Sequence, residues 1–214
     1  MTRMLKTILI GLMLGASFTL PAAAQTVLTG ADRSTKLQEV EAYLNSITTM
    51  QSEFIQTHSD GSRFTGKFYL NRPGRLRFEY APPSGDYIVA DGLLVHYWDN
   101  EVKNYSNAPI GSTLADFLLR KKIKLSGDLS VQEVKAVPDN RLLITLIQSA
   151  DPQAGKLSLL FDQGPLRLRR WRVIDGTNAM TEVSLYNIQT GIRIDPRLFI
   201  FKTPKGFETE AEKR

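Results

Sequence analysis

The sequence predicts a mainly β protein in which one long antiparallel sheet curves strongly or closes into a barrel. After Met50 the apolar residues recur with period two, which is typical of strands that bury one face. Turn pairs such as Asp60-Gly61, Asp91-Gly92 and Asp139-Asn140 separate these apolar runs. Such pairs supply the positive φ angles that tight hairpins require. The pattern therefore indicates about a dozen short strands joined mostly by hairpins.

The candidate strands follow one another along most of the chain. The first group lies near Phe54 and at 64–70, 76–80, 87–90, 93–98 and 101–106. The second group lies at 131–137, 142–148, 156–161, 166–174 and 180–190, and a last short strand is expected around 199–201. Strands this short and this numerous pack as one curved sheet or barrel.

Two helices are predicted outside the strands. From Ser34 to Met50 the apolar residues recur at three- and four-residue spacing, and Thr35-x-x-Gln38 forms a possible capping box. This helix either simply covers the core or moves as a lid, and both fit the pattern. A second, short helix is expected from Thr113 to Leu119, with Leu114, Phe117 and Leu118 on one face and the basic run Arg120-Lys121-Lys122 after it.

The amino terminus has the pattern of a secretory signal peptide. Arg3 and Lys6 precede an apolar stretch from Ile8 to Leu20, and Ala22-x-Ala24 provides a cleavage site. The apolar stretch is shorter than the roughly 20 residues that span a bilayer. We therefore expect residues 1–24 to be removed. Residues 25–214 contain no internal repeat or long linker, so we expect one domain there.

Composition excludes several classes of protein. The chain contains no cysteine, which excludes disulfides, thiolate metal sites and a cysteine-linked lipid anchor. The formal net charge of +5 falls to +3 when the two cations of the leader are removed. This excess is small for a nucleic-acid-binding protein, which normally gathers many Lys and Arg residues on one face.

The two histidines give no sign of a metal site. His58 and His96 are far apart and lack the spacing of zinc ligands. We expect His58 to be solvated before a turn and His96 to be a hydrogen-bonded strand residue. No cofactor-binding fingerprint, phosphate loop or nucleophile elbow is present in the sequence.

Paired carboxylates offer the only catalytic alternative. Glu53, Glu79, Asp86 and Asp91 could supply the acid and base of a glycosidase. However, Asp86 and Asp91 suit hairpin turns, and Glu79 alternates with arginines on an expected solvent face. The sequence therefore favours a binder, a scaffold or a carrier over an enzyme.

One continuous segment carries a family resemblance. Gly66-Lys-Phe-Tyr-Leu-Asn-Arg-Pro-Gly-Arg-Leu-Arg-Phe-Glu-Tyr80 is followed by Pro82, Ile88-Val89, Asp91-Gly92 and Tyr97. This order resembles the LolA family of periplasmic outer-membrane lipoprotein carriers. The likeness extends from the first helix to Phe199-x-Phe201-x-x-Pro204-x-Gly206, and thus over essentially the whole mature chain.

The resemblance implies a fold, a function and a set of partners. The fold is an incomplete antiparallel β-barrel of about eleven strands, covered by an α-helical lid. The implied function is to bind the acyl chains of lipoproteins and to ferry them from an inner-membrane ABC transporter towards the outer membrane, with or without a receptor there. We expect no cofactor and a monomer, because a carrier must present its mouth to two partners in turn.

The resemblance also assigns site residues. Arg72 corresponds to the family arginine that donates to carbonyls of the covering helices, whereas the residues alone suit an exposed turn with a solvated arginine. Where the family often has tryptophan or another aromatic residue in the next strand, this chain has Leu76 and Phe78. The residues expected to line the cavity, besides Leu76, are Phe68, Phe78, Trp98 and Phe117.

Three alternatives remain open at this point. An outer-membrane barrel would also be exported and rich in strands, but the charged carboxyl terminus and the amphipathic helix argue against it. The same fold could instead carry another lipid or act as a lipoprotein-sensing regulatory module. The cluster Arg167, Arg169, Arg170 and Arg172 is either a solvated strand face or a docking surface for the transporter.

Overall fold

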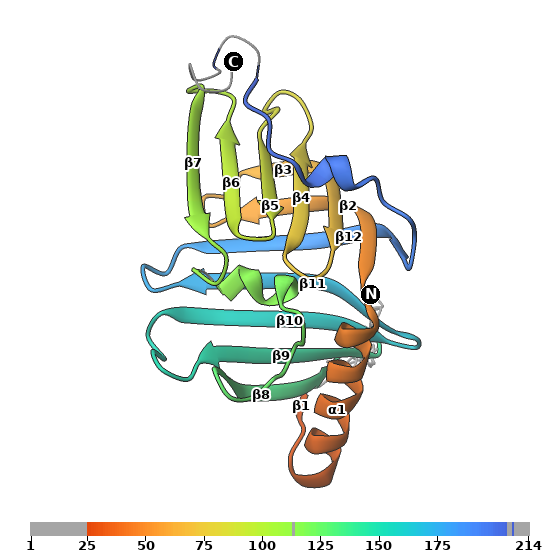
Figure 1. The fold of residues 1–214 in the computed structure, drawn as a ribbon. Coiled ribbons are helices and arrows are strands. Elements are labelled where there is room, and N and C mark those ends of the chain that lie inside the picture. Colours follow the sequence, from red (N-terminus) through yellow and green to blue (C-terminus); the bar gives the residue numbers. More distant parts are fainter. Residues whose placement is uncertain (1–24, 113, 205–206, 208–214) are drawn as a thin grey trace, which may run out of the picture.

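The computed structural model describes residues 25–112, 114–204 and 207, and the predicted signal peptide lies outside this range. The described residues form a single sheet of twelve antiparallel strands (Figure 1). The strands are β1 (Thr26–Val27), β2 (Thr49–His58), β3 (Arg63–Asn71), β4 (Arg75–Tyr80), β5 (Tyr87–Asp91), β6 (Leu94–Asp99), β7 (Asn104–Pro109), β8 (Leu129–Val137), β9 (Arg141–Gln148), β10 (Gly155–Gln163), β11 (Leu166–Asp175) and β12 (Met180–Thr190).

The sheet curves but does not close. Its order is β1-β8-β9-β10-β11-β12-β2-β3-β4-β5-β6-β7, so β1 and β7 are its two edges and do not pair with each other. Figure 1 shows β4–β7 crossing in front of β2, β3 and β12, which turns one face of the sheet inward. This confirms the predicted fold class, a mainly β protein with an incomplete antiparallel barrel, and the short strand β1 brings the number of strands to twelve.

Most predicted strands are present, and two predictions are wrong. Residues 101–103 belong to a turn in which Lys103 has a φ of 54°, so β7 begins only at Asn104. Around residue 199 the chain forms the 3-10 helix η2 (Pro196–Phe199) instead of a strand. Asp195 accepts a hydrogen bond from the backbone N–H of Arg197 and Pro196 occupies the first turn, which favours a helical start over a strand.

The long helix α1 (Gly30–Ser46) begins and ends four residues before the predicted limits. The predicted capping box is wrong, because the cap position is Thr29 and its side chain makes no capping hydrogen bond. At the other end Ile47 adopts extended backbone angles, and Met50 already pairs with Leu70 in the sheet. The apolar spacing continues past the helix because a strand with the same buried side follows it directly.

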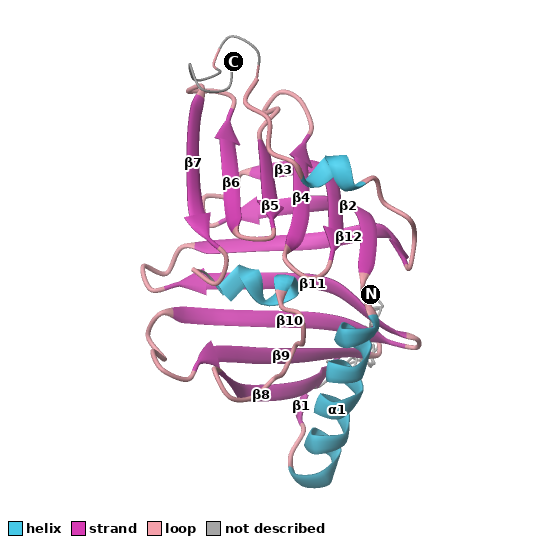
Figure 2. Cartoon of the chain, viewed as in Figure 1, coloured by secondary structure: helices cyan, strands magenta, loops and turns pink. Residues whose placement is uncertain are grey.

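The second predicted helix is the 3-10 helix η1 (Leu114–Leu119). Thr113 and the side chain of Leu114 lie outside the described residues. Figure 2 shows η1 in front of β10 and β11 and α1 along the ends of β8–β10, both on the same side of the sheet. Among the described residues, no helix is both long enough and apolar enough to span a bilayer.

The hydrophobic core lies on the inward face of the sheet. Alternate residues of each strand point to it, as the pleat requires, so that Leu157, Leu159 and Phe161 of β10 are fully buried while Ser158 between them is not. The core side chains from α1 and from residues 117–125 fill the same space. The two helices thus cover one continuous apolar surface that the sheet alone would leave exposed.

Gly66 of β3 tests how tightly this sheet is packed. A Cβ atom at this position would lie 2.0 Å from the Glu79 carbonyl oxygen and 2.8 Å from the Phe54 ring. We expect Gly66→Ala to lower the free energy of unfolding by about 2–3 kcal/mol, because β4 or the ring must move. Urea denaturation measures the change, and Gly164→Ala is the control because its Cβ would meet only the Asn140 amide nitrogen at 3.5 Å. Equal stability of the two variants would contradict the described packing.

Candidate functional site

The centre of the inward face is a cluster of aromatic rings from four strands. Phe54 of β2 meets Phe78 of β4 edge to face with ring centroids 5.0 Å apart. Phe68 of β3 contacts Phe78 with ring centroids 4.7 Å apart and Trp171 of β11 with ring centroids 5.8 Å apart. Buried aliphatic residues continue this surface in both directions along the sheet. The inward face therefore presents a broad apolar floor.

The lid over this floor consists of α1 and residues 114–125. From α1, Val40 and Leu44 point to the floor and are fully buried. From the second part, Phe117, Leu119 and Ile123 are at most 2% exposed. In this structure the lid side chains occupy the concavity and cover the apolar floor, an arrangement that we call the closed state.

The two parts of the lid are joined by polar side chains of α1. Asn45 Nδ2 donates to the Ile123 carbonyl at 2.8 Å, and Asn45 Oδ1 accepts from the Ile123 N–H at 2.9 Å. Glu41 accepts from the Leu125 N–H at 2.6 Å. These bonds satisfy backbone groups that the irregular segment after η1 cannot pair internally. Because of them, α1 and residues 123–125 are bound to each other directly.

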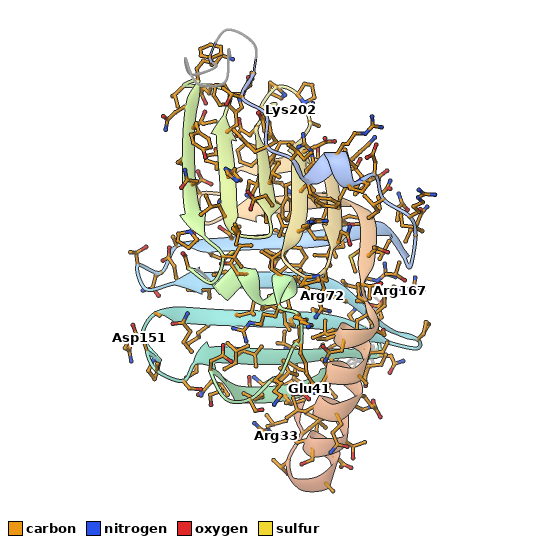
Figure 3. The ribbon with its side chains drawn as sticks, in the orientation of Figure 1. Arg33, Glu41, Arg72, Asp151, Arg167 and Lys202 are labelled. Carbon is orange, nitrogen blue, oxygen red and sulfur yellow. The ribbon has the colours of Figure 1, made fainter. Side chains whose placement is uncertain are left out.

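Arg72 ties both parts of the lid to the sheet. Figure 3 shows it where the end of α1 meets η1. Its Nη1 donates to the carbonyls of Leu44 at 2.5 Å and Ile47 at 3.1 Å, while Nε and Nη2 donate to the Arg120 carbonyl at 3.0 and 2.6 Å. Nη2 also lies 3.4 Å from the Lys121 carbonyl oxygen. Burial lowers the pKa of the Arg72 guanidinium from its ordinary value.

The chemistry of this contact follows from guanidinium geometry. The group has five N–H donors and no acceptor, so a partly buried arginine needs several carbonyls at once. The last turn of α1 contains no basic residue of its own, and Arg72 supplies a positive charge to its unpaired carbonyl end. One side chain thereby neutralises the helix end and holds the second lid segment.

The turn that carries Arg72 is itself fixed by backbone bonds. Arg72 N–H donates to the Thr48 carbonyl and Gly74 N–H donates to the Leu119 carbonyl, both at 2.8 Å. Gly74 has a φ of 77°, and a Cβ there would lie 3.0 Å from the Cα atom of Gly92. A glycine is therefore required at this position by conformation and by space.

Tyr43 anchors the lid at a second place. Its hydroxyl accepts a hydrogen bond of 2.9 Å from the Leu168 N–H, at the point where the pairing between β10 and β11 shifts by one residue. Its ring meets Phe161 edge to face with centroids 6.1 Å apart. Burial raises the pKa of Tyr43. The irregular pairing leaves an N–H group in β11 that the helix satisfies.

The structure brings together four of the six predicted site residues. Phe68, Leu76, Phe78 and Phe117 all belong to the core cluster beneath or within the lid. Arg72 lies at the border of this cluster, with its guanidinium among lid carbonyls.

Trp98 is not part of this cluster and lies on the opposite, outer face of β6. Strand residues alternate between faces, and Val95 of the same strand packs against the core, so Trp98 points away from it. Its ring contacts Phe207 at a centroid distance of 5.4 Å. Trp98 is buried on the outer face, where Phe207 packs against it, a contact that strand alternation alone does not reveal.

The carboxyl-terminal segment after β12 covers the outer face of β4–β7. Phe201 stacks on His96 at 5.0 Å and lies 4.8 Å from the Tyr105 ring. His96 Nε2 contacts Asp91 Oδ2 at 2.9 Å and its Nδ1 contacts the Tyr105 hydroxyl at 2.8 Å, so this histidine is hydrogen-bonded on both sides. A hollow of about 650 Å³ beside these residues lies on the outer face and is separate from the core.

The basic cluster on β11 is neutralised in large part by neighbouring strands. Arg170 and Arg172 both contact Glu182 of β12, at 2.9 and 2.6 Å. Arg169 contacts Asp162 of β10 at 2.5 Å. Arg167 is exposed. Within the described part of the chain, no three His, Asp or Glu side chains come together closely enough to hold a metal ion.

Several residues that build the site are not among the residues predicted from the sequence. Phe54 and Trp171 complete the aromatic floor, and both follow the strand alternation that identified Phe68, so the pattern could have found them. Asn45 and Glu41 carry no such signal, because polar residues on a helix normally face solvent. Their partners are backbone groups of residues about 80 positions further along the chain.

Comparison with known proteins places this architecture in a family. The family model described as "Outer membrane lipoprotein carrier protein LolA" matches residues 45–202. The chain belongs to the LolA family. The matched range of this LolA-family chain includes the end of α1, the Arg72 turn, η1 and all strands from β2 to β12.

Two relatives agree with this assignment at the level of sequence. An outer-membrane lipoprotein carrier protein of Methylococcus capsulatus is 26% identical over 189 residues, which cover 84% of this LolA-family chain and 89% of the relative. One of Legionella pneumophila is 30% identical over 183 residues, covering 81% and 89%. A crystal structure of a LolA superfamily protein from Nitrosomonas europaea aligns with a TM-score of 0.45 and 9% identity over 77% of this chain and 97% of its own.

Asn45 tests the bond between the two lid segments. We expect Asn45→Ala to destabilise the lid by about 1–3 kcal/mol, because the Ile123 N–H and carbonyl lose their partner while they stay buried. Hydrogen exchange read by mass spectrometry should show faster exchange in residues 119–125. Ser46→Ala on the same helix is the control, since its hydroxyl bonds only within α1. Unchanged exchange in Asn45→Ala would show that this contact does not hold the lid.

Proposed function

We propose that this protein is a periplasmic carrier that binds the acyl chains of lipoproteins and ferries them from the inner to the outer membrane. One observation carries the proposal. In a chain of the LolA family, a broad apolar floor is covered by a lid that is attached to the sheet by hydrogen bonds which Arg72 donates and one which the Tyr43 hydroxyl accepts. Such a lid can leave the floor as a unit when other apolar material replaces it.

The energetics of an acyl chain require such a surface. Each methylene exposed to water costs about 0.8 kcal/mol, so a chain of a dozen costs roughly 10 kcal/mol. Burial against Phe54, Phe68 and Ile144 is non-directional, and the inward face offers it along its whole length. One carrier can therefore accept many proteins that share only their acyl chains.

Release requires that the closed state compete with the cargo. An acyl chain on the floor and the lid side chains use the same space, so loading must displace Leu44 and Phe117. Closure restores the bonds from Arg72 to the Leu44 and Arg120 carbonyls. These bonds offset part of the burial free energy that is lost when the cargo leaves the floor. The lid is then a two-state element, and the balance between its states sets how readily cargo leaves.

The proposal extends to the partners and the location. Residues 1–24 act as a cleavable signal peptide, and residues 25–214 act as one carrier domain in the periplasm. An inner-membrane ABC transporter loads the carrier, an outer-membrane receptor or the membrane itself receives the cargo, and the carrier works as a monomer without catalysing a reaction. The match to the LolA family and the relatives' names, which describe outer-membrane lipoprotein carriers, support this proposal.

Cargo binding is tested by isolating the mature protein from the periplasm. We expect an acylated protein to copurify in stoichiometric amount, because the floor buries acyl chains regardless of the attached protein. Mass spectrometry identifies the cargo, and its deacylated form is the control and should not bind. Copurification of free lipid alone would favour a lipid carrier on the same fold.

Arg72→Leu tests the two-state lid. We expect the variant to fold, to favour the open state and to bind an acylated peptide about tenfold more tightly, because the competing closed state loses bonds to a charged donor. Handover of the cargo to membranes should become slower for the same reason.

The matched control for this variant is Arg75→Leu. Arg75 is exposed and lies three residues along the chain, at the start of β4. Affinity and handover should stay at the level of the unchanged protein. If Arg72→Leu binds the acylated peptide no more tightly than Arg75→Leu does, Arg72 does not regulate the lid.

A further inference from the structure

Among the described residues, the buried core contains a serine hydroxyl that forms no hydrogen bond within the fold. In the part of the chain that the structure describes, Ser52 Oγ is the buried side-chain atom that has no hydrogen-bond partner. Ser52 as a whole is only 3% exposed. Leaving a buried hydroxyl unpaired is unfavourable, because the group gives up its bonds to water and receives none in return. An alanine at this position would avoid that penalty in the closed state.

The hydroxyl points into the proposed acyl-binding floor. Met50, Ser52 and Phe54 are the buried residues of β2, and alternation places all three on the inward face. Ser52 lies opposite Phe68 of β3, one of the rings of the aromatic floor. Since β2 lies in the middle of the sheet order, Ser52 belongs to the central part of the concavity.

A break in the sheet lies directly beside Ser52. On β12 the partners of Gln51 and Glu53 are Gln189 and Tyr186, so two residues of β12 lie opposite the single residue Ser52. One of them, Asn187, has a φ of 50°. Bulges of this kind disturb the ladder locally and occur often beside binding sites.

We propose that the Ser52 hydroxyl donates a hydrogen bond to an ester carbonyl of the bound acyl chain. This inference rests on the proposed carrier function and names the polar group of the ligand that the floor recognises. An ester carbonyl accepts hydrogen bonds but donates none, whereas a hydroxyl can donate one. In a glyceryl ester each carbonyl is bonded directly to its alkyl chain. The ester carbonyls are therefore the hydrogen-bond acceptors that enter an apolar site together with the chains.

The position of Ser52 along β2 suits this role. Thr49 pairs with Asn71, next to Arg72, and Ser52 lies three residues further into the strand. At about 3.3 Å per residue, the hydroxyl is roughly 10 Å from the end of the floor where Arg72 holds the lid. An ester placed there leaves the floor beyond Phe54 and Phe68 for the hydrocarbon.

The test compares two ligands and two proteins. The ligands are a peptide on S-[2,3-bis(palmitoyloxy)propyl]cysteine, which contains two esters, and its bis(hexadecyloxy) diether analogue, which has no carbonyl in its chains. The proteins are the mature chain and Ser52→Ala. Dissociation constants are measured by displacement of a fluorescent fatty-acid analogue, and thermal unfolding is followed without ligand.

We expect Ser52→Ala to bind the diester about fivefold more weakly than the unchanged protein, as the loss of one neutral hydrogen bond predicts. The diether should bind both proteins with equal affinity. The empty variant should be as stable as the unchanged protein or more stable, because an unpaired hydroxyl has been removed. Ser158→Ala, whose hydroxyl lies near Thr145 on the other face, should bind both ligands normally.

Three outcomes would overturn the inference. If Ser52→Ala binds the diester as tightly as the unchanged protein does, the hydroxyl makes no bond to the ester. If the variant loses affinity equally for diester and diether, Ser52 acts on the shape of the floor. If the unchanged protein binds neither ligand, the carrier function itself fails. Should Ser52→Ala not fold, Ser52→Cys replaces the hydroxyl by a weaker donor of similar shape and is read in the same way.

Discussion

The structure depends on one constraint, which is that a wide apolar sheet face must be covered although the sheet does not close. In a closed barrel the opposite walls fill the interior with their own side chains. Here β1 and β7 remain separate edges, so the interior needs side chains from elsewhere. Helix α1 and residues 117–125 provide them. Their position follows from this need, and the proposed function adds that other apolar material can take their place.

The few hydrogen bonds of the lid distinguish two states that apolar burial alone does not distinguish. An alkyl chain and the side chains of Leu44 and Phe117 cover the floor in much the same way, because apolar burial depends on area and not on direction. The carbonyls at the end of α1 and after η1 differ, since an alkyl chain cannot pair with them and Arg72 can. The polar contacts therefore distinguish the closed state from a loaded one, although they contribute a small share of the buried surface.

Sequence patterns predict the parts of the fold that depend on neighbouring residues. Hairpins, strand alternation and the apolar stripe of α1 are local, and so Phe68 and Phe78 can be placed on the floor. Trp98 is misplaced by the same pattern because alternation indicates that a residue is buried without showing on which face, and its cover is a segment about 100 residues away. Asn45 and Glu41 pair with distant backbone groups, which leave no trace in the local pattern.

Arg72 and Ser52 have hydrogen-bond partners in opposite states of the lid. The guanidinium has its partners in this structure and would lose them in the proposed open state. The Ser52 hydroxyl has no partner in the closed structure and gains one only from a ligand that brings an acceptor to the floor. A ligand without an acceptor would still break the Arg72 bonds when the lid opens, but it would give the Ser52 hydroxyl no partner. The balance therefore favours opening for acyl esters over plain hydrocarbon, which gives a non-directional apolar surface a measure of chemical selectivity.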